Sequence, residues 1–169
     1  MDYSCDNFFA LPVKEFPAFG IAFSVSSTPV STGQPIPLPN NNTNPNVSTP
    51  VLLDVESTGH GLLIKRSGIY QLNYTLTVSL DNSPASPDGR ESAIFFLTLN
   101  GTTVSNSIPG SGTAVRTTFD DTGLVIVTSS VTLINLYQND LIQIVPTDIV
   151  NSASTVDVRS ATLTVTQIA

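Results

Sequence analysis

The clearest pattern along the chain is an alternation of apolar and polar residues between Gly68 and Leu80. The odd positions from Gln71 to Ser79 are polar. The even positions are all apolar or aromatic: Tyr70, Leu72, Tyr74, Leu76, Val78 and Leu80. Because successive side chains of a strand point to opposite faces, the segment predicts a long strand with one buried face. A helix would scatter the same apolar groups around its circumference.

Shorter alternating segments separated by turn residues predict about ten strands in total. The expected strands lie at 19–25, 51–56, 62–65, 69–80, 93–99, 114–119, 123–137, 141–145 and 156–168. Asn100-Gly101 favours a tight hairpin, because both residues accept a positive φ. Near Arg159-Ser160 the apolar positions change from even to odd, which predicts a β-bulge. With no amphipathic helix, the pattern indicates an antiparallel β-sandwich.

Two segments lack this alternation. Residues 1–18 contain Phe8, Phe9 and Phe16 without a period, and we expect an N-terminal arm, either loose or docked on a partner. Residues 26–50 are rich in Pro, Asn, Ser and Thr, which predicts a long loop with at most short edge strands. Residues 19–169 are enough for a single domain with its own core.

The composition supports a globular protein with few charges. Apolar residues make up 40% of the chain and charged residues 11%, against a typical charged share of roughly 25%. The net charge of −7 disfavours nucleic acid and anionic membrane surfaces as partners. A surface rich in Thr and Asn instead suits packing against neighbouring molecules.

Targeting and redox signals are few. The chain shows no signal peptide and no stretch near the roughly 20 apolar residues of a transmembrane helix. Cys5 is the only cysteine, which excludes an internal disulfide. We expect an inert thiol there, with an intermolecular cross-link as the alternative.

His60, the only histidine, lies between Gly59 and Gly61 in an expected turn. A catalytic triad would have to use this residue, and a zinc site ordinarily needs further imidazole or thiolate ligands. The flanking glycines favour turn geometry over an oriented base, so we predict no catalytic role for His60.

The acidic and glycine-rich segments also carry no specific signal for a metal site or a phosphate-binding loop. Asp54 and Glu56 share one face of a strand, so a divalent cation is conceivable there. Asp120 and Asp121 are adjacent and lack the spacing of an EF-hand, which predicts a solvated turn. Gly110-Ser111-Gly112 lacks the basic residue and helix of a phosphate loop. We therefore predict no catalytic residue, no cofactor and no metal site.

Two motifs, Gly68-Ile69-Tyr70 and the segment from Leu136 to Ile144, carry a family resemblance. They resemble the Gly-x-Tyr strand and the Leu-x-x-Gly-Asp turn and strand of the tumour-necrosis-factor and complement-globular-head superfamily. Asn139 replaces the usual glycine and tolerates the left-handed conformation. The resemblance implies a TNF-like jelly roll of about ten strands that assembles as a homotrimer.

A closer resemblance runs from about Phe16 to the end of the chain and is carried by segments 17–23, 68–72, 79–84, 108–116 and 163–168. In these segments the chain resembles the exosporium basal-layer protein family of Bacillus spores. It implies a non-enzymatic structural protein of the spore surface, made in the mother-cell cytoplasm, that anchors collagen-like filament glycoproteins. Side-chain carboxylates are candidate attachment points for those filaments.

Two other functions remain open. One is a surface or secreted recognition module that binds a receptor or glycan. The other is an enzyme, which would need a concave cluster of carboxylates with His60 or a metal. For the trimer, the alternation places Gln71, Asn73 and Thr75 on the face that relatives bury around their three-fold axis. Either that axis is polar, or other strands supply its apolar contacts.

Overall fold

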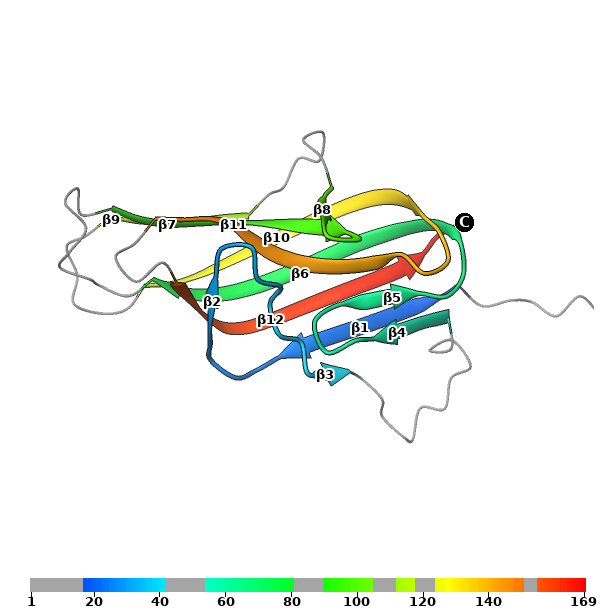
Figure 1. Ribbon diagram of the computed structural model, residues 1–169, viewed down its shortest axis with the longest axis horizontal. Coiled ribbons are helices and arrows are strands. Elements are labelled where there is room, and N and C mark those ends of the chain that lie inside the picture. Colours follow the sequence, from blue (N-terminus) through cyan, green and yellow to red (C-terminus); the bar gives the residue numbers. More distant parts are fainter. Residues whose placement is uncertain (1–16, 42–53, 81–89, 105–111, 118–123, 151–154) are drawn as a thin grey trace, which may run out of the picture.

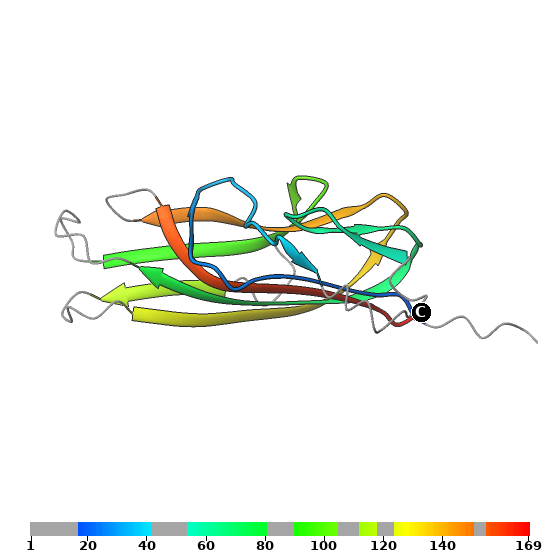
Figure 2. The ribbon, with the colours of Figure 1, turned by 90° about the horizontal axis from the view of Figure 1, so that it is seen from below.

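In the described part of the chain, two antiparallel sheets of six strands each pack face to face (Figures 1 and 2). The computed structural model describes residues 17–41, 54–80, 90–104, 112–117, 124–150 and 155–169. The strands are β1 Phe19–Ser24, β2 Thr28–Ser31, β3 Asn40–Asn41, β4 Val55–Ser57, β5 Leu62–Ile64, β6 Gly68–Leu80, β7 Arg90–Leu99, β8 Thr102–Thr103, β9 Gly112–Thr117, β10 Leu124–Leu136, β11 Leu141–Val150 and β12 Thr155–Gln167.

The order of the strands within each sheet differs from their order along the chain. The first sheet, called sheet 1, runs β10-β6-β12-β1-β3, and β2 also pairs with β12. The second, sheet 2, runs β4-β5-β11-β7-β8, and β9 also pairs with β7. Seen edge-on, the two sheets form two layers (Figure 2). The prediction of an antiparallel β-sandwich is confirmed.

Strand β6 has the predicted faces. Its even positions from Tyr70 to Val78 are at most 1% exposed, whereas Gln71 and Thr75 are exposed on the opposite side. Inward-facing side chains from both sheets complete the core, and Tyr74 also donates its hydroxyl hydrogen to the Phe95 carbonyl of sheet 2 at 3.3 Å. This bond connects the two layers through the core.

Close packing between layers also requires a glycine in β1. Gly20 points into the core, and a β-carbon there would collide with the Val55 side chain of β4. The absence of a side chain at Gly20 therefore lets β1 of sheet 1 approach β4 of sheet 2.

Both left-handed turn positions predicted from the sequence are present. Asn100 and Gly101 have φ values of 53° and 78° in the hairpin between β7 and β8. Asn139 has a φ of 73° between β10 and β11. The two turns are joined, because Asn100 Nδ2 donates to Asp140 Oδ1 at 2.8 Å. The Leu136–Ile144 motif thus forms a defined corner of the sandwich.

The predicted bulge in the last strand is confirmed, since the β12 register against β6 shifts between Val158 and Ser160. A second shift, between Pro146 and Asp148 in β11, was not predicted. Beyond it β11 continues to Val150, five residues past the expected end at Val145.

The described part of segment 26–50 contains the short edge strands β2 and β3. The segment between these two strands contributes to the core, which the sequence did not predict. Ile36 and Leu38 are 1% and 0% exposed. The Ile36 amide donates to the Ile144 carbonyl at 2.9 Å, so the proline-rich chain covers an edge of β11.

Candidate interaction face

The outer side of sheet 1, away from the core, is the candidate functional surface. We call it the open face and define it by outward-pointing residues of four neighbouring strands. They are Phe19, Ile21 and Phe23 of β1; Thr162, Thr164 and Thr166 of β12; Ile69, Gln71, Asn73, Thr75 and Thr77 of β6; and Leu133 and Asn135 of β10.

Strand register arranges these residues in rows across the sheet. One row runs Phe19, Thr166, Gln71 and Leu133, because each residue pairs with the next. Its centre is polar and its two ends are apolar. The next row repeats the arrangement with Ile21, Thr164 and Asn73.

The apolar groups at the border of the open face are unusually exposed. Phe19 is 37% exposed, Ile69 40% and Leu133 62%. Ile168 follows β12, is 52% exposed, and donates its amide hydrogen to the Ile69 carbonyl at 2.8 Å. Exposed apolar groups that gather on one face mark interaction surfaces, whereas isolated ones are ordinary.

The open face therefore combines both features that the sequence left as alternatives. The outward positions of β6 are polar, as the alternation predicts. Two of the exposed apolar side chains, Phe19 and Leu133, belong to β1 and β10, which flank the polar strands, and Ile69 lies near the start of β6. None of these defining residues is acidic or basic, whereas Asp157 and Arg159 point outward farther along β12.

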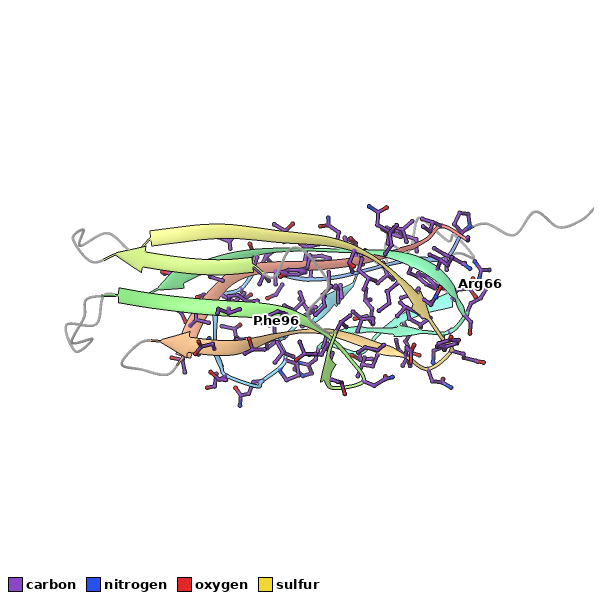
Figure 3. All side chains as sticks on the ribbon, turned by 90° about the horizontal axis from the view of Figure 1, so that it is seen from above. Arg66 and Phe96 are labelled. Carbon is purple, nitrogen blue, oxygen red and sulfur yellow. The ribbon has the colours of Figure 1, made fainter. Side chains whose placement is uncertain are left out.

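An ion-pair cluster lies at the end of the sandwich where the described chain ends (Figure 3). Arg66 Nη1 contacts Asp54 Oδ2 at 2.9 Å, and Arg66 Nε donates to Gln167 Oε1 at 2.9 Å. The same Gln167 oxygen accepts the Ala18 amide hydrogen at 3.2 Å. The cluster thus ties together segments from both ends of the domain.

The two carboxylates considered as a cation site belong to separate ion pairs. Lys65 Nζ contacts Glu56 Oε2 at 2.7 Å, while Asp54 pairs with Arg66. Within the part of the chain that the structure describes, no three His, Cys, Asp or Glu residues are grouped to hold a metal ion. The hypothesis of a divalent site at Asp54 and Glu56 gains no support.

His60 lies exposed in the turn between β4 and β5, as predicted. Its carbonyl oxygen accepts a weak hydrogen bond from Gln143 Nε2 at 3.5 Å. Cys5, Ser111, Asp120 and Asp121 lie outside the described residues. Among the residues described, no helix is long and apolar enough to cross a membrane.

No family model matches the chain, and no curated protein matches it. Among solved structures, the TNF protein Eiger of S. frugiperda is similar over 90% of this chain and 93% of its own, with a TM-score of 0.58 and 10% identity. The globular domain of the zebrafish complement 1qA protein is similar over 90% of this chain and 98% of its own, with a TM-score of 0.49 and 12% identity.

The chain has a TNF-like jelly-roll fold. The similarity to Eiger spans nearly the whole of both chains, and the two-layer strand arrangement agrees with it. At 10% identity this likeness concerns the fold alone. The predicted fold class is confirmed, and function has to be argued from the open face and from the sequence.

Proposed function

We propose that this protein is a non-enzymatic structural component that self-associates through its open face into a homotrimer, in the exosporium basal layer of a bacterial spore. The observation that carries the self-association is the group of exposed apolar side chains on an uncharged sheet face. A second copy that covers Phe19, Ile69 and Leu133 would remove their apolar surface from water. Moving a whole apolar side chain from water to the interior contributes about 1.5–3 kcal/mol, and each of these three would contribute the share that matches its remaining exposure.

The polar centre of the open face is compatible with such an interface. Gln71, Asn73 and the threonines of β12 carry both donors and acceptors, so reciprocal hydrogen bonds between copies can satisfy them. No charge has to be desolvated, which removes the largest cost of burying a polar surface. The number of copies, three, is supported by the resemblance of the Gly68–Tyr70 and Leu136–Ile144 motifs to a trimeric superfamily.

The location in the spore is supported by the sequence segments that resemble the exosporium basal-layer family, above all Ile108–Arg116. In this role the protein holds collagen-like filament glycoproteins, and side-chain carboxylates are the candidate attachment points. Peptide mapping of cross-links between filament and basal layer tests this part. Cross-links that include no Asp or Glu of this chain would exclude covalent attachment through its carboxylates.

The trimer is tested by placing a charge on the open face. Phe19→Glu and Leu133→Glu should each shift the protein from trimer to monomer in sedimentation experiments. A carboxylate buried without a partner costs several kcal/mol, so association should weaken by more than about 100-fold. Circular dichroism would verify that each variant keeps the fold.

Phe96→Glu is the matched control. Phe96 belongs to β7 of sheet 2 and points away from the core, on the other side of the molecule (Figure 3). This variant should remain trimeric. Wild-type protein that sediments as a monomer at about 1 μM, where a specific oligomer of ordinary affinity persists, would overturn the proposal.

The second candidate function is a recognition module for a receptor or glycan, favoured by the same fold and the same exposed face. Localisation separates the two. Tight co-purification with the outer layers of spores supports the structural role, whereas release as a soluble secreted protein supports recognition.

A further inference from the structure

The corner that joins the β7–β8 hairpin to the β10–β11 turn contains a chemically labile pair of residues. Asn100 is exposed and is followed in the chain by Gly101. In an Asn-Gly pair, the backbone nitrogen of the glycine can attack the side-chain carboxamide of the asparagine, because glycine has no side chain to obstruct the approach. The pair belongs to sheet 2 and lies outside the open face.

The reaction that threatens such a pair is deamidation. Attack of the Gly101 nitrogen on Asn100 Cγ closes a five-membered succinimide ring, and the Cγ–Nδ2 bond breaks. The proton of the attacking nitrogen leaves with Nδ2, as ammonia. Water then opens the ring at either carbonyl, which gives Asp or its isomer linked through the side-chain carboxyl carbon. The reaction needs only water, and asparagine is for this reason among the heat-labile residues.

Three hydrogen bonds hold Asn100 against the β10–β11 turn. Its Nδ2 donates to Asp140 Oδ1 at 2.8 Å, and its Oδ1 accepts the Leu141 amide hydrogen at 2.9 Å. Its backbone amide donates to the Leu141 carbonyl at 2.9 Å. Both polar atoms of the carboxamide are thus bonded to another segment of the chain. Ring closure needs a carboxamide free to rotate onto the Gly101 nitrogen, and the loss of Nδ2 breaks the bond to Asp140.

Asp140 is itself fixed by the turn that carries it. Its Oδ2 accepts the Tyr137 amide hydrogen at 2.8 Å, while its Oδ1 accepts from Asn100. A hydrogen bond to a carboxylate is stronger than one between neutral groups. Deamidation would replace the donating Nδ2 by an oxygen and place a second carboxylate against Asp140. One hydrogen bond would be lost, and two like charges would meet in its place.

We infer that Asn100 is a latent deamidation site, that its contact with Asp140 protects it, and that its deamidation releases the corner between the two turns. The protection follows from the bonds that hold the carboxamide away from Gly101. The release follows from the negative charge of the product. This inference goes beyond the proposed function, because it concerns a covalent change within one copy and not a contact between copies.

Peptide mapping by mass spectrometry measures the protection. Trypsin releases residues 91–116 as a single peptide, because no Lys or Arg lies between Arg90 and Arg116. Fragment ions within this peptide distinguish deamidation at Asn100 from deamidation at Asn106. Folded wild type should deamidate at Asn100 at least about tenfold more slowly than the same chain unfolded in urea, because the reaction has to await a local opening of the corner. Equal rates in the two states would overturn the inferred protection.

Asp140→Ala tests which residue protects Asn100. The folded variant should deamidate about fivefold faster than folded wild type, since it lacks one hydrogen bond to the carboxamide. Gln138→Ala is the matched control, because Gln138 is exposed in the same turn, and it should deamidate at the wild-type rate. Circular dichroism verifies that both variants are folded. Equal rates for the two variants would show that Asp140 does not protect Asn100.

The effect of deamidation on the corner is tested by substituting the product directly. Asn100→Asp should unfold at a lower urea concentration than wild type. The double variant Asn100→Asp/Asp140→Asn exchanges donor and acceptor, so it should recover most of the lost midpoint. An Asn100→Asp midpoint equal to that of wild type, or no recovery in the double variant, would overturn the inferred release. A monomeric wild type would end the proposed trimer and leave all of these measurements valid.

Discussion

Tyr70 shows how one residue of the alternating pattern acquires a specific role. Its ring is fully buried, and its hydroxyl donates to the Arg66 carbonyl at 2.7 Å. Burial raises the pKa of Tyr70 above its ordinary value of 10.0, against the opposing effect of the nearby Arg66 charge. The sequence predicts that Tyr70 is buried. It does not reveal the partner of the hydroxyl, because that partner depends on how the β5–β6 turn closes.

The raised pKa predicts a dependence of stability on pH. Between pH 10.0 and the higher folded pKa, folded Tyr70 keeps a proton that the unfolded chain releases. Its contribution is therefore complete below pH 10 and decreases as the pH rises further. Tyr70→Phe should lose about 1 kcal/mol at neutral pH, from the missing hydrogen bond, and show a weaker loss of stability in alkali.

Urea denaturation of both proteins at neutral pH and above pH 10 would measure the difference. The control is Tyr137→Phe, since Tyr137 is 66% exposed. If wild type and Tyr70→Phe lost the same free energy of unfolding on the alkaline side, Tyr70 would not be the titrating group.

Individual elements were predicted more successfully than their arrangement. Alternation identified β6, β7 and β12 together with their buried faces, because a half-buried strand shows both in its own residues. In β1 the alternation identified the strand but not the buried face: the large apolar Phe19 points outward, while Ala22 and Ser24 are buried. The order of strands within each sheet depends on contacts between distant segments, so the residues of a single strand do not determine it. The buried Ile36 and Leu38 were missed for another reason: the prolines around them are typical of a loop.

The turn before β11 allows a direct test of one predicted element. Asn139 has a φ of 73°, where a β-branched side chain is strained, while glycine is not. Asn139→Val should therefore lower the free energy of unfolding by about 1–2 kcal/mol. Asn139→Gly, the matched variant, should change it by only about a few tenths of a kcal/mol. Equal unfolding midpoints for the two variants in urea would contradict a left-handed turn at this position.

At the scale of the whole molecule, the open face was predicted only in part. The polar positions of β6 follow from the sequence, since they alternate with its core residues. The apolar border does not follow from the sequence, because Phe19 and Leu133 are 114 positions apart and lie in one row only through the order β1-β12-β6-β10. The Arg66–Gln167 contact joins residues 101 positions apart in the same way. A surface built from strands that are distant in the sequence can be predicted only when the order of strands in the sheet is known.

The uncharged open face also predicts how assembly responds to salt. Each copy carries a net charge of −7, so copies repel one another at low ionic strength, while the contact itself contains no ion pair for salt to weaken. Raising sodium chloride from about 0.1 M to about 1 M should therefore leave the proposed trimer intact or tighten it slightly. Sedimentation across this range measures the effect, with Phe19→Glu as the control that stays monomeric throughout. An oligomer that dissociates as salt increases would point to charged groups, and an interface elsewhere on the molecule.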